Sequence, residues 1–396
     1  MQLKAGAAAD DIRFMRTHRL RRVVLPLFVG WWAIALAAQD LENIQIHGFA
    51  TQGFLYSSHN NYLSMNSSAG SLAWTQGVIN FNDPVTDNLR VGLQLRMYQL
   101  GQFGGPNVVV DWALGDYKVN DKLGIRAGKI KIALGLFNDF QDIDPVYLWT
   151  LLPQGMYPVE NEGFDLAELG GGAYGNFHLG TRGGRLQYFV HGGSSGLDPN
   201  GGYLEQLAEL GFTFPTPPSG KTYGADLRWA TPARGLTMGS GVLGQALDGT
   251  GPQGAMHVPM SYTLAYYAQW DRGKLHLAGE YWRTPFNLVF TSGGVVASVL
   301  EDQREWYPMV SYDLTGKVQV GSYFSHYVNQ SGDTSQPVNY SKDWVVSTRY
   351  NFNPYLYAKL EGHFLHGTGL GYYTSTNPNG LQPNSSLLAA RIGFSF

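Results

Sequence analysis

The stretch Ser386-Leu-Leu-Ala-Ala-Arg-Ile-Gly-Phe-Ser-Phe396 alternates apolar and polar side chains. In an extended strand, Leu388, Ala390, Ile392, Phe394 and Phe396 share one face, and Arg391, Gly393 and Ser395 share the other. A strand with one wholly apolar face either packs on a soluble core or lies in a membrane barrel, with lipid outside and a polar lumen inside. This stretch alone leaves both fold classes open.

The amino-terminal part of the sequence has the features of an export signal. A basic run over 15–22 precedes the apolar stretch 23–36, and Ala35 and Ala37 are the small residues that a signal peptidase needs. A membrane anchor is disfavoured, because a helix needs ~20 apolar residues to span a bilayer. We expect residues 1–37 to be an amino-terminal extension and cleaved signal peptide, and 38–396 to form one barrel domain. The start at Met1 or Met15 is left open.

The composition fits a chain that crosses an oxidising compartment. It has no cysteine, which excludes disulfides and cysteine-ligated metals, and no cofactor is expected. It has 51 Gly, 24 Tyr, 20 Phe and 10 Trp, which suit tight turns and aromatic girdles at membrane interfaces. Without residues 1–37, 21 basic and 28 acidic residues remain, a net charge of −7. This charge disfavours nucleic acid as a partner.

Alternating segments recur along the whole of the remaining chain. We expect strands near 44–58, 72–82, 88–100, 107–119, 122–132, 169–180, 184–194, 221–231, 235–247, 257–270, 273–284, 302–313, 316–329, 341–352, 354–367 and 386–396. The number of segments is even, as single-chain bacterial barrels require. The pattern therefore predicts an all-β fold, a closed antiparallel transmembrane β-barrel of about 16 strands.

The lengths of the connections support the same fold. Short connections at 83–87, 120–121, 181–183, 231–234, 271–272, 314–315 and 353 alternate with longer ones at 59–71, 133–168, 195–220, 248–256, 285–301, 330–340 and 368–385, with 101–106 as the exception. Outer-membrane barrels pair short periplasmic turns with long outer loops in this way, and a soluble sandwich has no reason to.

With this strand number and its longest loop in third place, the chain resembles the outer-membrane porins. The segment Leu123-Gly-Ile-Arg-Ala-Gly-Lys-Ile-Lys-Ile-Ala-Leu-Gly-Leu136 is similar to the phosphate-selective porin O/P-like family, although the chain lacks a concentrated basic lining. The resemblance implies a homotrimeric channel in the bacterial outer membrane whose third loop folds into the lumen. A terminal aromatic such as Phe396 resembles the end of barrels that the assembly machinery recognises.

Polar residues on two predicted lipid faces agree with a protein partner. Gln52, Lys129 and Lys131 stand where apolar side chains are expected. Polar groups are costly in hydrocarbon unless they are paired. We therefore expect subunit contacts near 44–58 and 122–132, and outer-membrane lipid around the other strands.

The expected constriction opposes wall bases and loop acids. Strand parity places these bases inside: Arg90, Arg96, Arg126, Arg228, Lys274, Arg349, Lys359 and Arg391. The third loop carries the acids Asp139, Asp142, Asp144, Glu160, Glu162 and Asp165 and an apolar cluster over 146–152 that needs a wall to pack on. We predict a constriction of Arg90, Arg96, Arg126, Asp139, Asp142, Asp144, Glu160 and Glu162, whose transverse field sorts solutes. The alternative is that the bases pair with wall acids.

The predicted function is passive diffusion of small hydrophilic solutes or ions through a water-filled pore, because a barrel of 16 strands is too wide for its side chains to fill. Two alternatives remain: a channel selective for a hydrophobic or lipid-like solute, and a barrel hydrolase. For a hydrolase only Ser194 near His191 can be assembled, and a third partner is missing. We therefore expect that the chain is not an enzyme.

Overall fold

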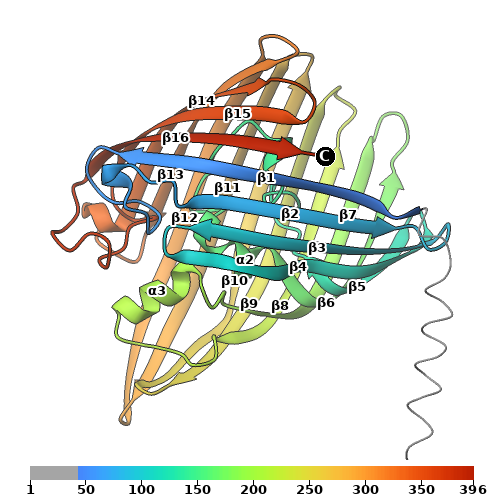
Figure 1. Ribbon diagram of the computed structural model, residues 1–396. Coiled ribbons are helices and arrows are strands. Elements are labelled where there is room, and N and C mark those ends of the chain that lie inside the picture. Colours follow the sequence, from blue (N-terminus) through green and yellow to red (C-terminus); the bar gives the residue numbers. More distant parts are fainter. Residues whose placement is uncertain (1–42) are drawn as a thin grey trace, which may run out of the picture. The chain divides into compact units, whose positions relative to one another are not determined.

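The computed structural model describes residues 43–396, and the predicted signal peptide lies outside them. In the described part, sixteen antiparallel strands form one closed ring, and β16 pairs with β1 (Figure 1). The strands are β1 (Gln45–Ser57), β2 (Trp74–Asp83), β3 (Leu89–Leu100), β4 (Phe103–Asn120), β5 (Leu123–Lys131), β6 (Ala167–His178), β7 (Arg185–Gly196), β8 (Ser219–Ala230), β9 (Leu236–Gly251), β10 (Gly254–Arg272), β11 (Leu275–Ser292), β12 (Val295–Asp313), β13 (Val318–Asn329), β14 (Tyr340–Asn351), β15 (Leu356–His366) and β16 (Asn384–Ser395). The predicted fold class is confirmed.

The ring closes at the two strands nearest the ends of the described chain. In Figure 1 the blue β1 lies beside the red β16, and their register runs from Phe49 opposite Ser395 to Ser57 opposite Leu387. Gly48 and Phe396 exchange backbone hydrogen bonds of 3.1 and 3.0 Å. A Cβ on residue 48 would lie 2.7 Å from the Phe396 ring, so the closing pair needs glycine there.

The two faces of the barrel differ in composition as the alternation predicts. Along β10, Tyr262, Leu264 and Tyr266 are exposed on the outside, whereas Ala265 and Tyr267 are buried on the inside. Large apolar side chains exposed in a row are unstable in water and stable against lipid. The outer surface is therefore the membrane-facing one.

Strands β9 to β12 are longer than the sequence pattern indicated. The ranges 248–256 and 285–301, expected as loops, continue these strands up to tight turns at 252–253 and 293–294. A transmembrane strand needs about 9–11 residues, and β10, β11 and β12 have 19, 18 and 19. Within the extra length, apolar side chains such as Phe286 and Phe290 face the inside of the barrel. The apolar-outside, polar-inside alternation that identified the other strands is therefore lost there.

The lipid-face assignment of Lys131 is wrong. Its Nζ lies 2.7 Å from Oδ1 of Asp142 in the third loop. The other two polar residues of the predicted contact face are exposed or half-buried and bind carbonyls: Gln52 donates to Leu72 (2.7 Å), and Lys129 donates to Val110 (2.8 Å). The positive φ of Gly128 (128°) breaks the regular alternation of β5 just before these lysines.

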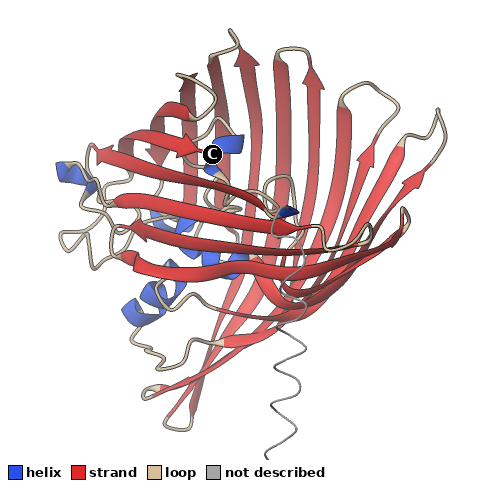
Figure 2. Ribbon diagram, turned by 45° about the vertical axis from the view of Figure 1, so that its right-hand side comes forward, coloured by secondary structure: helices blue, strands red, loops and turns tan. Residues whose placement is uncertain are grey.

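The connections carry the few helical segments, which are blue in Figure 2. The third loop, residues 132–166, holds the short helices η3 (Asp144–Val146), η4 (Val159–Asn161) and α2 (Glu162–Asp165). The fourth loop, residues 197–218, holds α3 (Gly202–Glu209). In the described part of the chain, no helix is both long and apolar enough to cross a membrane.

Candidate functional site

The third loop lies inside the barrel. It makes polar contacts with side chains of β3, β11, β15 and β16, strands from different parts of the ring. A segment can reach all of these strands only from the inner side of a closed barrel. The predicted packing of the cluster 146–152 on a wall is also present, because Leu148, Trp149 and Leu152 pack with wall residues such as Tyr323 and Val345.

Asp144 is the best-compensated carboxylate of the loop. Its Oδ1 lies 2.6 Å from Arg391 Nη1 and 3.1 Å from Lys359 Nζ, and Tyr357 donates a 2.5 Å hydrogen bond to Oδ2. All three partners are inner-wall residues of β15 and β16. Burial alone would raise the pKa of Asp144, but the two cations hold that pKa below its ordinary value. Asp144 therefore joins the loop to the wall as an ionised group.

Wall bases also bind the carbonyl groups of the loop. Arg349 Nη1 donates to Pro145 (2.6 Å) and Tyr147 (3.0 Å), and Lys359 Nζ donates to Trp149 (2.9 Å). These carbonyls have no partner within a helix or strand, so the wall satisfies backbone groups that would otherwise be left unpaired.

Wall carboxylates bind the amide groups of the loop. Glu361 accepts hydrogen bonds from the N–H groups of Thr150 and Leu151, both at 2.9 Å, and Glu280 accepts one from Leu136 at 3.1 Å. Donors and acceptors of the same loop are thus matched by acids and bases on the barrel. Charge-assisted bonds of this kind are stronger than neutral ones and hold the loop in one position.

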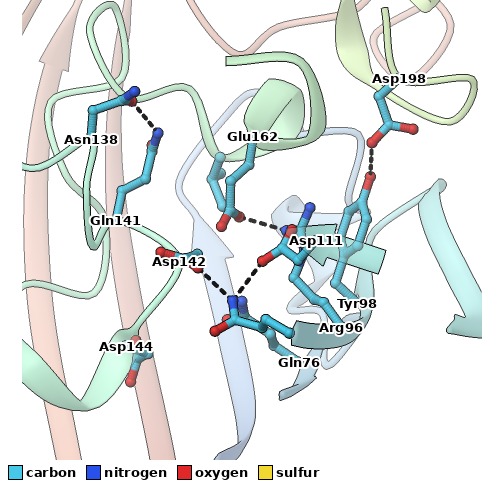
Figure 3. Close-up of polar contacts among 12 residues, drawn as sticks. Gln76, Arg96, Tyr98, Asp111, Asn138, Gln141, Asp142, Asp144, Glu162 and Asp198 are labelled. Atoms are coloured by element: carbon cyan, nitrogen blue, oxygen red, sulfur yellow. Dashed lines mark hydrogen bonds and ion pairs between the residues drawn. The ribbon is translucent and has the colours of Figure 1, made fainter. Parts of the chain in front are cut away.

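Arg96 joins the other end of the loop to β3 and β4 (Figure 3). It lies 3.0 Å from Asp111 and 2.8 Å from Glu162, and its side chain is only 1% exposed. Gln94 connects Asp111 (2.7 Å) to Asp142 (2.5 Å) beside it. The expected pairing of Arg96 with a loop acid is therefore present, through Glu162.

Arg90 and Arg126 lie elsewhere on the wall. Both bind Asp116 of β4, at 3.2 and 2.9 Å, and Tyr174 donates a 2.5 Å hydrogen bond to the same carboxylate. Among the described residues, no loop acid is an ion-pair partner of Arg90, in contrast to the expectation. These two bases follow the alternative pattern, in which wall bases pair with wall acids.

Asp139 is the most accessible of the predicted loop acids. Its side chain is 46% exposed, and its ion-pair contact is a long one of 3.8 Å to Arg228. Arg228 also donates to the Gly135 carbonyl at 3.1 Å. This pair is partly exposed, unlike the buried pairs of Asp144 and Arg96.

Glu160 is buried and Asp165 is half-buried, and neither has a base as an ion-pair partner among the described residues. Glu160 accepts one hydrogen bond, from Tyr373 at 3.2 Å, and its Oε2 has no partner among the described residues. Oδ2 of Asp165 has no partner there either. Burial raises the pKa of each carboxyl to about 7, and their mutual repulsion adds to the rise for Asp165.

Sequence reasoning missed several residues that hold the loop. Lys359 and Arg391 were expected on the inner face but not in the constriction set, and Lys131 was expected on the lipid face. Gln94 shares the inward parity of Arg90 and Arg96, and that parity could have identified it. Asp111 follows the run Val108-Val-Val110 on an irregular strand, where parity gives no guide.

The hydrolase alternative finds no geometric support in the described residues. His191 Nδ1 lies 2.9 Å from Glu168 in the barrel interior, and its Nε2 has no hydrogen-bond partner there. Ser194 pairs across the strands with Leu169 and is not a partner of His191. Within residues 43–396, no group of three or more His, Cys, Asp or Glu side chains could hold a metal ion.

Comparison with family models finds no match, and neither does comparison with curated proteins. Solved structures do match. The anion-selective porin from Comamonas acidovorans is 10% identical with a TM-score of 0.56, covering 89% of this chain and 99% of that one. The trimer form of OmpT from Vibrio cholerae is 11% identical with a TM-score of 0.51 (89% and 99%). The outer-membrane channel DcaP of Acinetobacter baumannii is 13% identical with a TM-score of 0.50 (89% and 97%).

At these identities the likeness establishes the fold: the chain has the β-barrel of outer-membrane porins and channels. The apolar outer surface and this fold together support a bacterial outer-membrane location.

Proposed function

We propose that the chain is an outer-membrane porin through which small hydrophilic solutes and ions diffuse passively. The observation that carries this proposal is the fixed position of the third loop inside a barrel of 16 strands. A barrel of this size leaves an aqueous passage unless something fills it. A loop held to the inner wall through Asp144, Glu280 and Glu361 narrows the passage without sealing it.

The same contacts indicate which charged side chains a solute meets where the third loop narrows the pore. The ion pairs of Asp144 and Arg96 are buried, so the accessible Asp139 and Arg228 contribute more to the field that a solute meets. The predicted constriction of Arg90, Arg96, Arg126, Asp139, Asp142, Asp144, Glu160 and Glu162 stays a prediction. So does the absence of enzymatic activity.

The finer assignments belong to the same proposal. The segment 123–136 supports kinship with the phosphate-selective porin O/P-like family, and the proposal includes a homotrimer. One structure of similar fold is described as a trimer. Recognition of Phe396 by the barrel-assembly machinery and cleavage of residues 1–37 complete the proposal.

Planar-bilayer recording of the purified chain tests the function. We expect discrete conductance steps, and a larger single-channel conductance when residues 140–152 are deleted, because the loop no longer occupies the lumen. Deletion of 331–335, in the loop between β13 and β14, is the control and should leave the conductance unchanged. Absence of steps would refute the porin function, and equal conductance of both deletions would place the constriction elsewhere.

A further inference from the structure

An open cavity of about 340 Å³ lies between the third loop, helix α3 and the inner wall of β9 to β12. This is the side of the lumen away from the Asp144 contacts on β15 and β16. Small-molecule sites in proteins are typically concave, about 300–1,000 Å³ in volume and mostly apolar with a few polar groups. The cavity has the size of such a site.

The wall of this cavity is apolar, although it belongs to the inner face of the barrel. Leu247, Val258, Phe286 and Phe290 point inward from the strands, and Phe164 and Leu207 meet them from the two loops. A passage for water and ions alone is expected to be lined by polar side chains. These side chains pack on one another as one cluster, and the open space of the cavity remains beside them, which favours an apolar occupant.

The charged groups of the lining have one sign. Of the described residues that line the cavity, Asp165 and Glu301 are acidic, and none is Lys, Arg or His. An anionic ligand would bring a further negative charge beside these two carboxyls in a poorly solvated space, at a large electrostatic cost. A cation there would compensate them.

Two polar atoms of the lining have no partner. These are Oδ2 of Asp165 and Nε2 of Gln245, both without a hydrogen bond among the described residues. Unpaired buried polar atoms are rare in folded proteins, and a ligand is one way to satisfy them. Asp165 supplies an acceptor for an ammonium group, and Gln245 supplies a donor for a neighbouring polar atom.

We propose that this cavity binds organic cations with an apolar body, that is, aromatic or aliphatic amines. The apolar part lies against β9 to β12, and the ammonium group meets Asp165 with Glu301 nearby. This inference rests on the proposed porin function and names a substrate class for the same lumen. The charge of the lining separates it from a site for neutral hydrocarbons or for fatty acids.

Titration calorimetry on the detergent-solubilised full chain, with micelle blanks, tests the proposal with three probes of one shape: 4-phenylbutylamine, 4-phenylbutanol and 4-phenylbutyrate. We expect the amine to bind tightest and the butyrate weakest. Asp165→Asn should weaken amine binding by about tenfold, the loss of one charge-assisted contact, and leave the alcohol nearly unchanged. Asp139→Asn, a loop carboxylate outside the cavity, is the matched control.

A second variant locates the site. Val299→Phe fills part of the cavity from the wall of β12 and should weaken the binding of all three probes. If Asp165→Asn does not fold, Glu301→Gln takes its place as the test of charge. Equal binding of amine and alcohol, or tightest binding of the butyrate, would overturn the proposal. Conductance steps without amine binding would leave the porin function standing and refute this inference, whereas binding without conductance would refute the porin function alone.

Discussion

Three carboxylates of the third loop lie in opposite surroundings. Asp144 contacts two cations and a tyrosine hydroxyl of the wall, whereas Glu160 and Asp165 contact no base among the described residues. The same type of side chain is therefore held ionised at Asp144 and drawn towards its neutral form at Glu160 and Asp165. The first environment fixes the loop to the barrel. The second leaves two acids without a base, and one of them, Asp165, lines the open cavity.

The largest expected effect comes from removing Asp144, the carboxylate that two wall cations compensate. Asp144→Ala leaves Lys359 and Arg391 as buried charges without their carboxylate. Removing one partner of a buried ion pair typically costs about 3–5 kcal/mol. We expect a loss of this size in the free energy of unfolding in urea, measured by tryptophan fluorescence in detergent.

Asp139→Ala is the matched control for that measurement. Asp139 belongs to the same loop, but its side chain is 46% exposed and its contact with Arg228 is 3.8 Å long. We expect a change below about 0.5 kcal/mol, as for other surface substitutions. Similar losses in both variants would show that Asp144 does not anchor the loop.

A smaller effect of opposite sign is expected at Glu160, which has no base beside it. The pKa of Glu160 is raised from 4.5 to about 7, so the folded protein keeps a proton that the unfolded chain releases. Stability from this carboxyl is present at low pH and is lost as the pH rises from about 4.5 through 7. Glu160→Gln keeps an acceptor for Tyr373 and removes this loss. At pH 8 it should stabilise the protein by at most about 3 kcal/mol.

Unfolding midpoints of wild type and Glu160→Gln at pH 5 and pH 8 measure this effect. The difference between the two proteins should be small at pH 5 and larger at pH 8. Glu361→Gln is the opposite control, because Glu361 accepts two backbone amides and should lose stability on substitution. A variant Glu160→Gln that is less stable at pH 8 would show that a cation reaches this carboxylate.

The sequence predicted the barrel well because lipid imposes alternation on every strand. All sixteen strands were located. The largest errors fell at 248–256 and 285–301 in β9 to β12, where apolar side chains face inward and the alternation is lost. Strand parity also placed Arg96, Lys359 and Arg391 on the inner face. Parity says which face a side chain lies on but not how far along the barrel axis it lies. It therefore could not show that Arg90 pairs with Asp116 of the wall and not with an acid of the loop. The bulges of β3 and β4 and the positive φ of Gly128 hid the roles of Asp111 and Lys131.

The smallest expected effect concerns Arg90, a wall residue of β3 whose ion-pair partner is Asp116 of β4. Its side chain is 49% exposed, and Arg126 binds the same Asp116 at 2.9 Å, so Arg90→Ala leaves that carboxylate paired. Exposed pairs contribute about 0–1 kcal/mol, and we expect a stability change within that range.

Removing one accessible cation from the lumen should still shift the reversal potential in a salt gradient slightly towards cation selectivity. The shift should shrink at high salt, because screening shortens the reach of an exposed charge. A large shift that persists at high salt would place Arg90 at the narrowest point of the pore, where its field acts on ions at close range, and would return it to the constriction with the loop acids.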